Sequence, residues 1–294
     1  MNSSPSLVIL AGGLGSRYKG SKQIDLFGEQ EAFLLEFAMY DAVEAGFESI
    51  VLIVIEHVQA EMKSKLKHWE AKVALHVVLQ ELSPVQEQKV HPNRIKPWGT
   101  AHALLCAQPF IKGPFVVMNA DDYYGTSVMK TAYSFFQNEV DFHGLLSYSL
   151  SATLSEHGGV SRGLCAVDEN GFLESIVECL GIVKNDTGIQ CQNGIYLADN
   201  DRISMNMWFF QKSISSYLQT YFEAFFAEKS AELTTECYLP SMVQSGIEDD
   251  KFKVKVLSSQ EKWVGLTFPE DKNAVMQHIS ELTLRNVYPK SFSL

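Results

Sequence analysis

The chain has 294 residues, of which 46% are hydrophobic and 20% are charged, so its composition is that of a folded globular protein. Asp and Glu number 35 against 24 Lys and Arg, which gives a formal net charge of −11. This acidity argues against a protein that grips nucleic acid through bulk charge. It does not exclude a site where a few local donors bind a phosphate.

The sequence pattern predicts neither a membrane span nor a secretory leader. The longest strongly apolar run, 50–55, is far shorter than the roughly 20 residues needed to span a bilayer. The first residues lack the basic region of a secretory leader. Five scattered cysteines form no CxxC pair, which predicts reduced thiols and a cytoplasmic protein.

Strand and helix patterns alternate in the first half of the chain. Short apolar runs indicate buried strands, and apolar residues three and four apart indicate helices. The expected strands are 7–11, 50–55, 73–79 and 115–118, and the expected helices are 31–45, 57–68 and 100–108. This alternation predicts a parallel sheet with right-handed crossovers, whose ligands bind beyond the carboxyl ends of the strands.

The second half has a different character. Residues 144–198 hold short strands separated by turn residues, with a hairpin turn expected at 168–171. Further along, helices are expected at 209–228, 234–245 and 270–283, with a strand at 252–257. The aromatic residues between Trp208 and Phe226 fit the core face of the first of these helices. Since no segment has the composition of a linker, we expect one domain over 1–294.

A glycine-rich segment follows the first strand directly. Ala11-Gly12-Gly13-Leu14-Gly15 is followed by Arg17 and Lys22. Glycines let backbone amides approach a ligand closely, while arginine offers a fork and lysine a point charge to phosphate oxygens. The segment predicts a polyphosphate site, and a tight turn with exposed basic residues is the alternative. A dinucleotide-binding fingerprint fits less well, because Tyr18 stands at the place of its third glycine.

Two adjacent carboxylates follow the strand at 115–118. Side chains alternate along an extended chain, so Asp121 and Asp122 cannot both point the same way, and one of them is expected to face the site. Carboxylate oxygens suit Mg²⁺, which also binds substrate phosphates. A structural role for the pair is the alternative.

The first strand, AGGLGSR and the following Lys22-Gln23 resemble the signature of the sugar-1-phosphate nucleotidylyltransferases, which make nucleotide sugars. The spacer before Lys22 is shorter than usual and lacks the family's proline. The resemblance implies an α/β fold, with a doubly wound, mostly parallel, Rossmann-like sheet and a smaller β-rich acceptor elaboration. Residues 1–143 would form the nucleotide-binding half, and 144–294 the acceptor-binding half with the C-terminal helices.

The resemblance also implies roles for residues of the first half. Arg17 would stabilise the leaving pyrophosphate, Lys22 would bridge the two reacting phosphates, and Asp121 would bind Mg²⁺. Trp98-Gly99-Thr100 resembles the family segment that leaves space for the nucleobase, and Gln80 matches a position that contacts the base edge. For Gln80 a solvated strand end is the alternative. The implied nucleotide-binding residues are Ala11, Gly12, Gly13, Gly15, Gln80, Gly99 and Thr100.

Acceptor contacts are implied in the second half, where the sequence departs from the family pattern. The implied acceptor-binding residues are Gly163, Glu178, Lys184 and Asn206. Cys179 stands where the family has a lysine that contacts the sugar phosphate, and Lys184 is the nearby candidate to replace it. Gly265 stands where a second metal-binding aspartate is usual. Asp271 is a weaker metal candidate, because it also fits the first turn of the last helix.

The sequence therefore predicts a Mg²⁺-dependent nucleotidyltransferase that joins a nucleoside triphosphate to a sugar 1-phosphate and releases pyrophosphate. The expected partners are these two small molecules, with no nucleic acid or membrane, and the oligomeric state is left open. A nucleotidyltransferase for another phosphorylated small molecule and a non-catalytic nucleotide-binding module remain alternatives. A nicotinamide-dependent oxidoreductase is a more distant one.

Overall fold

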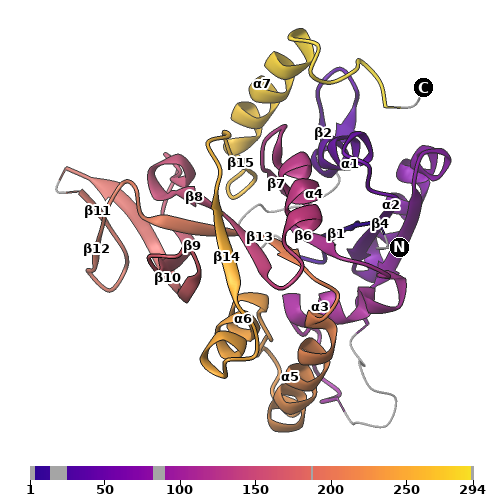
Figure 1. The fold of residues 1–294 in the computed structure, drawn as a ribbon. Coiled ribbons are helices and arrows are strands. Elements are labelled where there is room, and N and C mark those ends of the chain that lie inside the picture. Colours follow the sequence, from indigo (N-terminus) through magenta and orange to yellow (C-terminus); the bar gives the residue numbers. More distant parts are fainter. Residues whose placement is uncertain (1–3, 14–24, 82–89, 187, 293–294) are drawn as a thin grey trace.

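One 11-stranded sheet runs through both halves of the chain (Figure 1). The structure is a computed structural model, and it describes residues 4–13, 25–81, 90–186 and 188–292. The parallel part of the sheet has the order β5-β4-β1-β6, so that β1 lies between β4 and β6. Its strands are β1 (Ser6–Ala11), β4 (Ser49–Val54), β5 (Ala74–Leu79) and β6 (Phe115–Asn119).

The rest of the sheet is mainly antiparallel and begins beside β6. Strand β13 pairs antiparallel with β6, β8 and β9, while β14 adds a parallel strand to β8. Strands β10, β11 and β12 continue outward from β9 as an arm, seen at the left of Figure 1. These strands are β8 (His143–Ser149), β9 (Val160–Val167), β10 (Leu173–Asn185), β11 (Gly188–Gln190), β12 (Tyr196–Leu197), β13 (Arg202–Phe210) and β14 (Val254–Ser258).

Helices cover both faces of the parallel strands. Leu7 and Ile9 of β1 belong to the apolar cluster under α1, α2, α4 and α7, while Val8 and Leu10 belong to the cluster under α3, α5 and α6. Because neighbouring side chains of a strand point to opposite faces, the continuously apolar β1 serves both cores. The helices are α1 (Leu34–Glu44), α2 (Glu56–Lys65), α3 (Thr100–Ala107), α4 (Val128–Asn138), α5 (Ile214–Lys229), α6 (Leu239–Glu248) and α7 (Asp271–Leu284).

Short elements complete the structure around the carboxyl end of β6. Strand β7 (Asp122–Tyr123) pairs antiparallel with β15 (Val264–Gly265), so that Gly265 lies opposite Asp122. Strands β2 (Leu26–Phe27) and β3 (Ala32–Phe33) form a separate pair. Among the described residues there are also 3-10 turns, namely η2 (Leu66–Ala71), η3 (Gln108–Phe110) and η4 (Leu150–Thr153).

The predicted fold class is confirmed, as are the strands and helices expected in the first half. The helix expected at 209–228 begins only at Ile214, and Trp208, Phe209 and Phe210 lie instead in β13. All three are fully buried, because they pack against both apolar clusters. The helix expected at 234–245 begins at Leu239, with Pro240 in its first turn, where a missing N–H costs least. Among the described residues, no helix is long and apolar enough to cross a membrane.

Candidate active site

A pocket of about 410 Å³ opens at the carboxyl end of β6, and we call it the strand-end pocket. Its walls come from both halves of the chain, with β6 and β7 on one side and β9, β10 and β13 on another. The described residues that line it are Thr100, Asn119, Asp121, Asp122, Ser161, Arg162, Gly163, Ile176, Glu178, Ser204, Met205, Asn206, Tyr238, Pro240, Ser241, Trp263 and Thr267.

The two adjacent carboxylates both line this pocket but lie in different surroundings. Asp122 is 7% exposed, and its Oδ2 accepts hydrogen bonds from Asn119 Nδ2 at 2.9 Å and Tyr124 Oη at 3.1 Å. Asp121 is half-buried, and its carbonyl oxygen accepts a hydrogen bond from the backbone of Leu266 at 3.0 Å. The more accessible Asp121 is thus the carboxylate better placed to meet a ligand, with Asp122 fixed beside it.

A chain of side-chain amides holds the wall of the pocket. Trp208 Nε1 donates to Asn206 Oδ1 at 2.7 Å, and Asn206 Nδ2 donates to Asn119 Oδ1 at 2.8 Å. Asn119 in turn donates to Asp122, so the indole of β13 is linked to the carboxylate of β7. Asn206 has a φ of +61° at a register shift in β13, a conformation that asparagine tolerates better than most residues. Its amide therefore orients neighbours on both sides while it lines the pocket.

The start of α3 borders the pocket and is fixed by contacts with two other segments. Gly99 has a φ of +88°, and a Cβ atom there would lie 2.5 Å from the carbonyl oxygen of Cys237, so only glycine fits. Thr100 lines the pocket, and its Oγ1 accepts a hydrogen bond from the backbone N–H of Leu239 at 2.8 Å. These contacts hold together the loop that ends at Gly99, the start of α3 and the start of α6.

Gln80 is buried rather than a solvated strand end. Its Nε2 donates to the carbonyl oxygen of Gly99 at 2.9 Å and lies 3.3 Å from His102 Nδ1. Burial and the charge of Arg94 lower the pKa of His102 to about 4, so the ring is neutral near pH 7. A Cβ atom at Gly12 would lie 2.8 Å from Gln80 Oε1, which places the end of β1 directly against this amide.

Part of the predicted nucleotide site lies outside the described residues, namely Gly15, Arg17 and Lys22. The described residues of the predicted site are Ala11, Gly12 and Gly13, together with Gln80, Gly99 and Thr100. Ala11 is the buried last residue of β1, and Gly12 and Gly13 follow at the carboxyl end of the strand. Because β1 pairs parallel with β6, this end lies on the same edge of the sheet as Asn119.

The acceptor residues predicted from the sequence separate into two groups. Gly163 of β9 and Glu178 of β10 are directly opposite each other, and both line the pocket together with Asn206. Lys184 does not line it and instead forms an exposed ion pair with Asp199 at 3.2 Å. The replacement of the family lysine by Lys184 stays a prediction that this geometry does not support, because Lys184 lies five residues beyond Cys179 in β10, on the arm.

Asp271 begins α7 and is occupied there. Its Oδ2 accepts hydrogen bonds from the backbone N–H groups of Thr267 at 2.9 Å and Phe268 at 2.7 Å. These contacts fix the turn that leads into α7, and Asp271 lies in the first turn of that helix, as the alternative reading of the sequence predicts. Asp271 is absent from the described lining of the strand-end pocket, so the geometry offers no support for a metal role.

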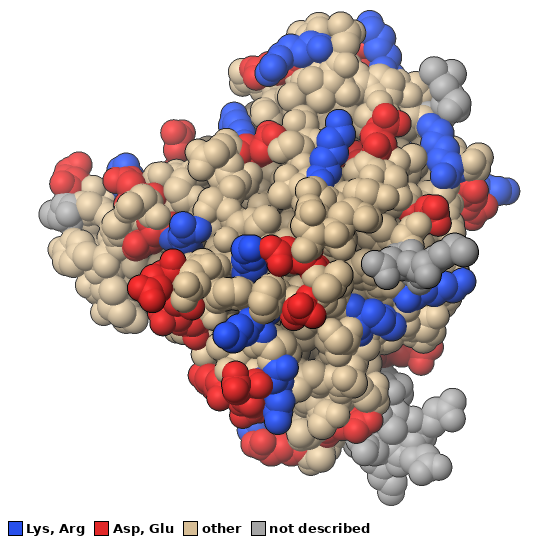
Figure 2. Space-filling view, viewed as in Figure 1, with Lys and Arg blue, Asp and Glu red and all other residues tan. Residues whose placement is uncertain are grey.

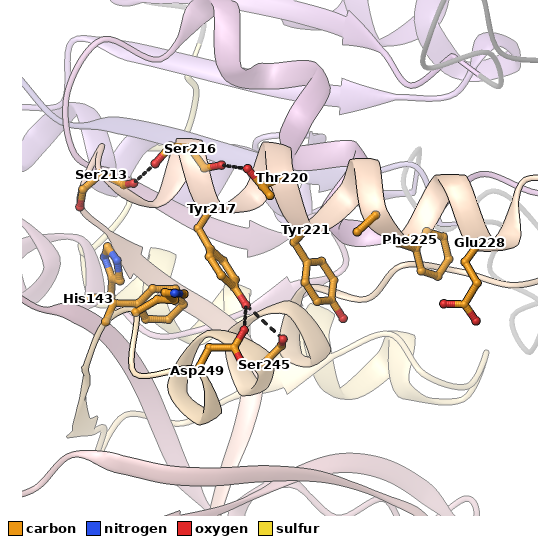
Figure 3. Close-up of a pocket in the computed structure, with 13 residues that line it drawn as sticks. His143, Ser213, Ser216, Tyr217, Thr220, Tyr221, Phe225, Glu228, Ser245 and Asp249 are labelled. Atoms are coloured by element: carbon orange, nitrogen blue, oxygen red, sulfur yellow. Dashed lines mark hydrogen bonds between the residues drawn. The ribbon is translucent and has the colours of Figure 1, made fainter.

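A larger hollow of about 820 Å³ lies between α5 and α6, and we call it the helix groove (Figure 3). Tyr217 Oη lies 3.0 Å from Ser245 Oγ and 3.3 Å from Asp249 Oδ2, which ties the two helices together. None of the predicted site residues lies among its described lining. The groove is lined by His143, Ser213, Ser216, Tyr217, Thr220, Tyr221, Ala224, Phe225, Glu228, Ser245, Asp249, Lys251 and Phe252.

Comparison with known families gives one match, to nucleotidyl transferases, over residues 6–263. The chain belongs to the nucleotidyl transferase family. The matched residues of this nucleotidyltransferase include the glycine-rich segment that follows β1 and the two adjacent aspartates that follow β6. No curated protein matched the sequence.

Solved structures share the fold of this nucleotidyltransferase at low sequence identity. An inositol-1-phosphate CTP transferase from T. maritima is 19% identical, with a TM-score of 0.63, and the match covers 96% of this chain and 98% of that one. A protein named as a glucose-1-phosphate thymidylyltransferase from Bacillus anthracis is 14% identical, with a TM-score of 0.64, covering 95% and 96%. At these identities the likeness shows the fold.

Sequence reasoning missed several residues that this nucleotidyltransferase places in the pocket. Arg162 and Trp263 line it side by side, with the guanidinium carbon 5.0 Å from the centre of the indole ring. Tyr238 and Ser241 enter from the start of α6. The sequence could have indicated Arg162 only as a charged residue next to the predicted Gly163. The other missed residues could not be predicted, because their place in the pocket depends on how distant segments pair.

Proposed function

We propose that the chain transfers a nucleotidyl group from a nucleoside triphosphate to the phosphate of a sugar or cyclic polyol, with Mg²⁺. An acceptor phosphate oxygen attacks the α-phosphorus, the bond to the β-phosphate oxygen breaks, and pyrophosphate leaves. No base is needed, because the attacking oxygen is already anionic at pH 7. The observation that carries this proposal is the pocket itself, in which Asp121, Glu178 and Asn206 of a nucleotidyltransferase line one cavity beside the carboxyl end of β6.

The acceptor class is suggested by the polar groups of the pocket. Glu178 can accept hydrogen bonds from hydroxyl groups, and Ser204 and Ser241 offer hydroxyls of their own. Gly163, opposite Glu178, packs closely against Ile176 and Ser204, since a Cβ atom there would lie 3.0 Å from Ile176 Cδ1 and 3.2 Å from Ser204 Cβ. The solved relatives named for inositol 1-phosphate and glucose 1-phosphate fit such an acceptor.

The carboxylates fit a magnesium ion that is shared with the substrates. Among the described residues, no three or more His, Cys, Asp or Glu side chains form a complete metal site. Mg²⁺ commonly takes one or two carboxylates and completes its shell with phosphate oxygens and water. Asp121 would hold it, with Asp122 as its fixed neighbour, and the ion would supply neutralisation of the phosphate charges.

Positioning is the remaining task of the protein chain, since two anions must be held in line. We assign the triphosphate to the loop at Gly12 and Gly13, the leaving pyrophosphate to Arg17 and the bridging contact to Lys22. The locked start of α3 forms the adjoining wall.

The test is a matrix of substrates. Purified protein with Mg²⁺ is mixed with each nucleoside triphosphate and with glucose 1-phosphate or inositol 1-phosphate, and pyrophosphate release and product mass are measured. We expect release that requires both substrates and a product equal to their sum minus pyrophosphate. Binding of a triphosphate without release for any acceptor would favour a non-catalytic module instead.

A further inference from the structure

The C-terminal segment, residues 285–292, packs against the body of the protein. It follows α7 and runs toward α1 (Figure 1). Tyr288 and Phe292 are each 2% exposed, and their rings lie 5.0 and 5.2 Å from the ring of Phe37 of α1, centre to centre. Lys72 Nζ donates a hydrogen bond to the carbonyl oxygen of Phe292 at 2.7 Å. The segment is therefore a fixed part of the fold.

The hydroxyl of Tyr288 lies in the middle of a buried hydrogen-bond chain. It donates to Asp41 Oδ2 of α1 at 2.8 Å and lies 2.8 Å from Tyr123 Oη of β7. A hydroxyl carries one proton, so Tyr123 is the donor in the second of these bonds. Tyr123 is itself 2% exposed, and a buried hydroxyl that loses its partner costs free energy. Tyr288 thus ties β7 to the C-terminal segment and to α1.

The geometry of β7 connects this hydrogen-bond chain to the strand-end pocket. The strand consists of Asp122 and Tyr123, whose side chains point to opposite faces because neighbours alternate along a strand. Asp122 lines the pocket, while Tyr123 meets Tyr288 on the other side. Asp121, which precedes the strand, lines the pocket as well. A shift of Tyr123 therefore moves the backbone that carries both carboxylates.

Strand β7 lies outside the main sheet and depends on its side chains for support. It forms a two-stranded sheet with β15, which is separate from the 11-stranded sheet. Both strands are two residues long, and so short a pair is weakly stable without further packing. Asn119 and Tyr124 hold Asp122 on the pocket side, and Tyr288 holds Tyr123 on the other.

We propose that Tyr288 is a positioning residue of the reaction, whose hydroxyl anchors β7 through Tyr123 and so holds Asp121 and Asp122 at the pocket. The inference rests on the proposed function, because it takes the carboxylates to serve in nucleotidyl transfer. Tyr288 is not among the described residues that line the pocket, so it acts through β7 and not on a substrate. Small displacements of groups that hold two reactants in line lower the rate strongly.

The first experiment uses Tyr288→Phe, which removes the hydroxyl and keeps the ring. Pyrophosphate release is measured with Mg²⁺, each nucleoside triphosphate, and glucose 1-phosphate or inositol 1-phosphate. We expect kcat to fall by about 5- to 20-fold, because the carboxylates lose their fixed position. The KM values for both substrates should stay within about threefold, since the groups that line the pocket are unchanged.

Tyr40→Phe is the matched control for this substitution. The ring of Tyr40 lies 5.7 Å from that of Tyr288 and 5.4 Å from that of Phe292, so it contacts the same segment. Within the described part of the chain its hydroxyl makes no hydrogen bond. Loss of this hydroxyl should leave kcat within about twofold of the wild type.

Hydrogen exchange separates positioning from a general loss of stability, and it needs no turnover. In Tyr288→Phe the amides of residues 121–124 should exchange about 5- to 10-fold faster than in the wild type, because β7 has lost an anchor. The amides of α5 should keep their rates, since this helix packs in the other apolar cluster. A general loss of stability would accelerate exchange in both segments.

A double variant tests whether the bond between the two hydroxyls carries the effect. Tyr123→Phe removes the same bond from the other partner, so it should lower kcat to a similar extent. If one bond is responsible, Tyr123→Phe combined with Tyr288→Phe should lose no more activity than either variant alone. Independent effects would multiply instead. Tyr123→Phe also replaces Tyr288→Phe in the kinetic test if the latter does not fold.

Several outcomes would overturn the proposal. They are an unchanged kcat in Tyr288→Phe, an equal loss in Tyr40→Phe, multiplied losses in the double variant, and faster exchange in α5 as well as in 121–124. Failure of both single variants to fold would also contradict it, because it would assign the hydroxyls a purely structural role. If the wild-type protein releases no pyrophosphate with any substrate, the proposed function fails, and exchange alone decides whether Tyr288 anchors β7. If the wild type is active, failure of the Tyr288 test touches this inference alone.

Discussion

The strand-end pocket and the helix groove contrast in size and in chemistry. The groove is the larger, at about 820 Å³ against about 410 Å³. Its wall consists mostly of one face of α5, whereas the pocket gathers residues from β6, β7, β9, β10, β13 and α6. The candidate site is distinguished not by volume but by polar groups from several elements that converge beside the carboxyl end of β6. On the face in Figure 2, acidic and basic side chains are interspersed, which agrees with recognition by local groups.

The largest expected difference concerns the carboxylates. Asp121→Asn should lower kcat/KM by about 10²- to 10³-fold, since the neutral amide stabilises a shared metal ion poorly. Asp249→Asn in the helix groove is the matched control and should change it less than about twofold. Steady-state pyrophosphate release measures both, with melting temperatures as a check on folding. An equal fall of kcat/KM in the two variants would contradict the assignment of the active site to the strand-end pocket.

Lys22 tests the phosphate-binding role predicted for the glycine-rich segment that follows β1. Lys22→Ala should lower kcat by about 100-fold, because the bridging charge between two phosphates is lost. Lys19→Ala, three residues earlier in the same loop, should stay within about threefold of the wild type. The same assay decides, and a larger loss at Lys19 than at Lys22 would refute the assignment.

The amide chain behind the pocket should give a moderate effect. Asn206→Ala breaks the bonds to Asn119 and Trp208 and places alanine at a φ of +61°, which should cost about 2 kcal/mol of unfolding free energy. Activity should fall about tenfold, because Asn119, which donates to Asp122, loses the hydrogen bond from Asn206 that orients it. Asn206→Gly should recover about 1 kcal/mol, because glycine accepts this φ. Urea denaturation measures the difference, and equal stability of the two variants would show that φ is irrelevant there.

Stability near the pocket should depend on pH through Asp41. Tyr288 Oη donates to Asp41 at 2.8 Å and lies 2.8 Å from Tyr123 Oη, next to Asp122. Burial raises the pKa of Asp41 from 3.8 to about 8, so the folded state keeps a proton that the unfolded chain loses. The unfolding free energy should therefore fall as the pH rises from about 4 to about 8. In Asp41→Asn this fall should be smaller, and an unchanged pH profile would contradict the shift.

Tyr217 in the helix groove should give the smallest effect. Tyr217→Phe removes the contacts with Ser245 and Asp249, and it should cost about 1 kcal/mol or less of unfolding free energy because these groups stay near solvent. Its kcat and KM values should match the wild type. A marked loss of activity would mean that the groove takes part in the reaction.

The sequence alone predicted those strands and helices whose apolar pattern is unambiguous. Continuous apolar runs identified β1, β4 and β6, because strands covered on both faces have no polar side. The same signal failed at Trp208–Phe210, where three buried aromatics suit a helix and a strand equally well. These residues form a strand because they pair with β6 and β8, which are distant in the sequence.

The candidate site divides in the same way. Asp121, which lines the pocket, was predicted because a strand delivers it directly to a sheet edge, and Gly99 because its segment matches a family pattern. Arg162 was missed as a residue of the pocket wall, whereas Lys184 was predicted because it is close in sequence to Cys179. The register of β9 and β10 instead places Arg162 opposite Cys179, and no pattern within one segment encodes that register.

The central claim is nucleotidyl transfer to an acceptor phosphate, and tracing acceptor oxygens tests it most directly. The reaction is run with glucose 1-phosphate or inositol 1-phosphate carrying ¹⁸O in the phosphate, and the products are examined by mass spectrometry. The account predicts that all of the label remains in the nucleotide-linked product and none enters pyrophosphate. Pyrophosphate that carries label, or that forms without any acceptor, would contradict it.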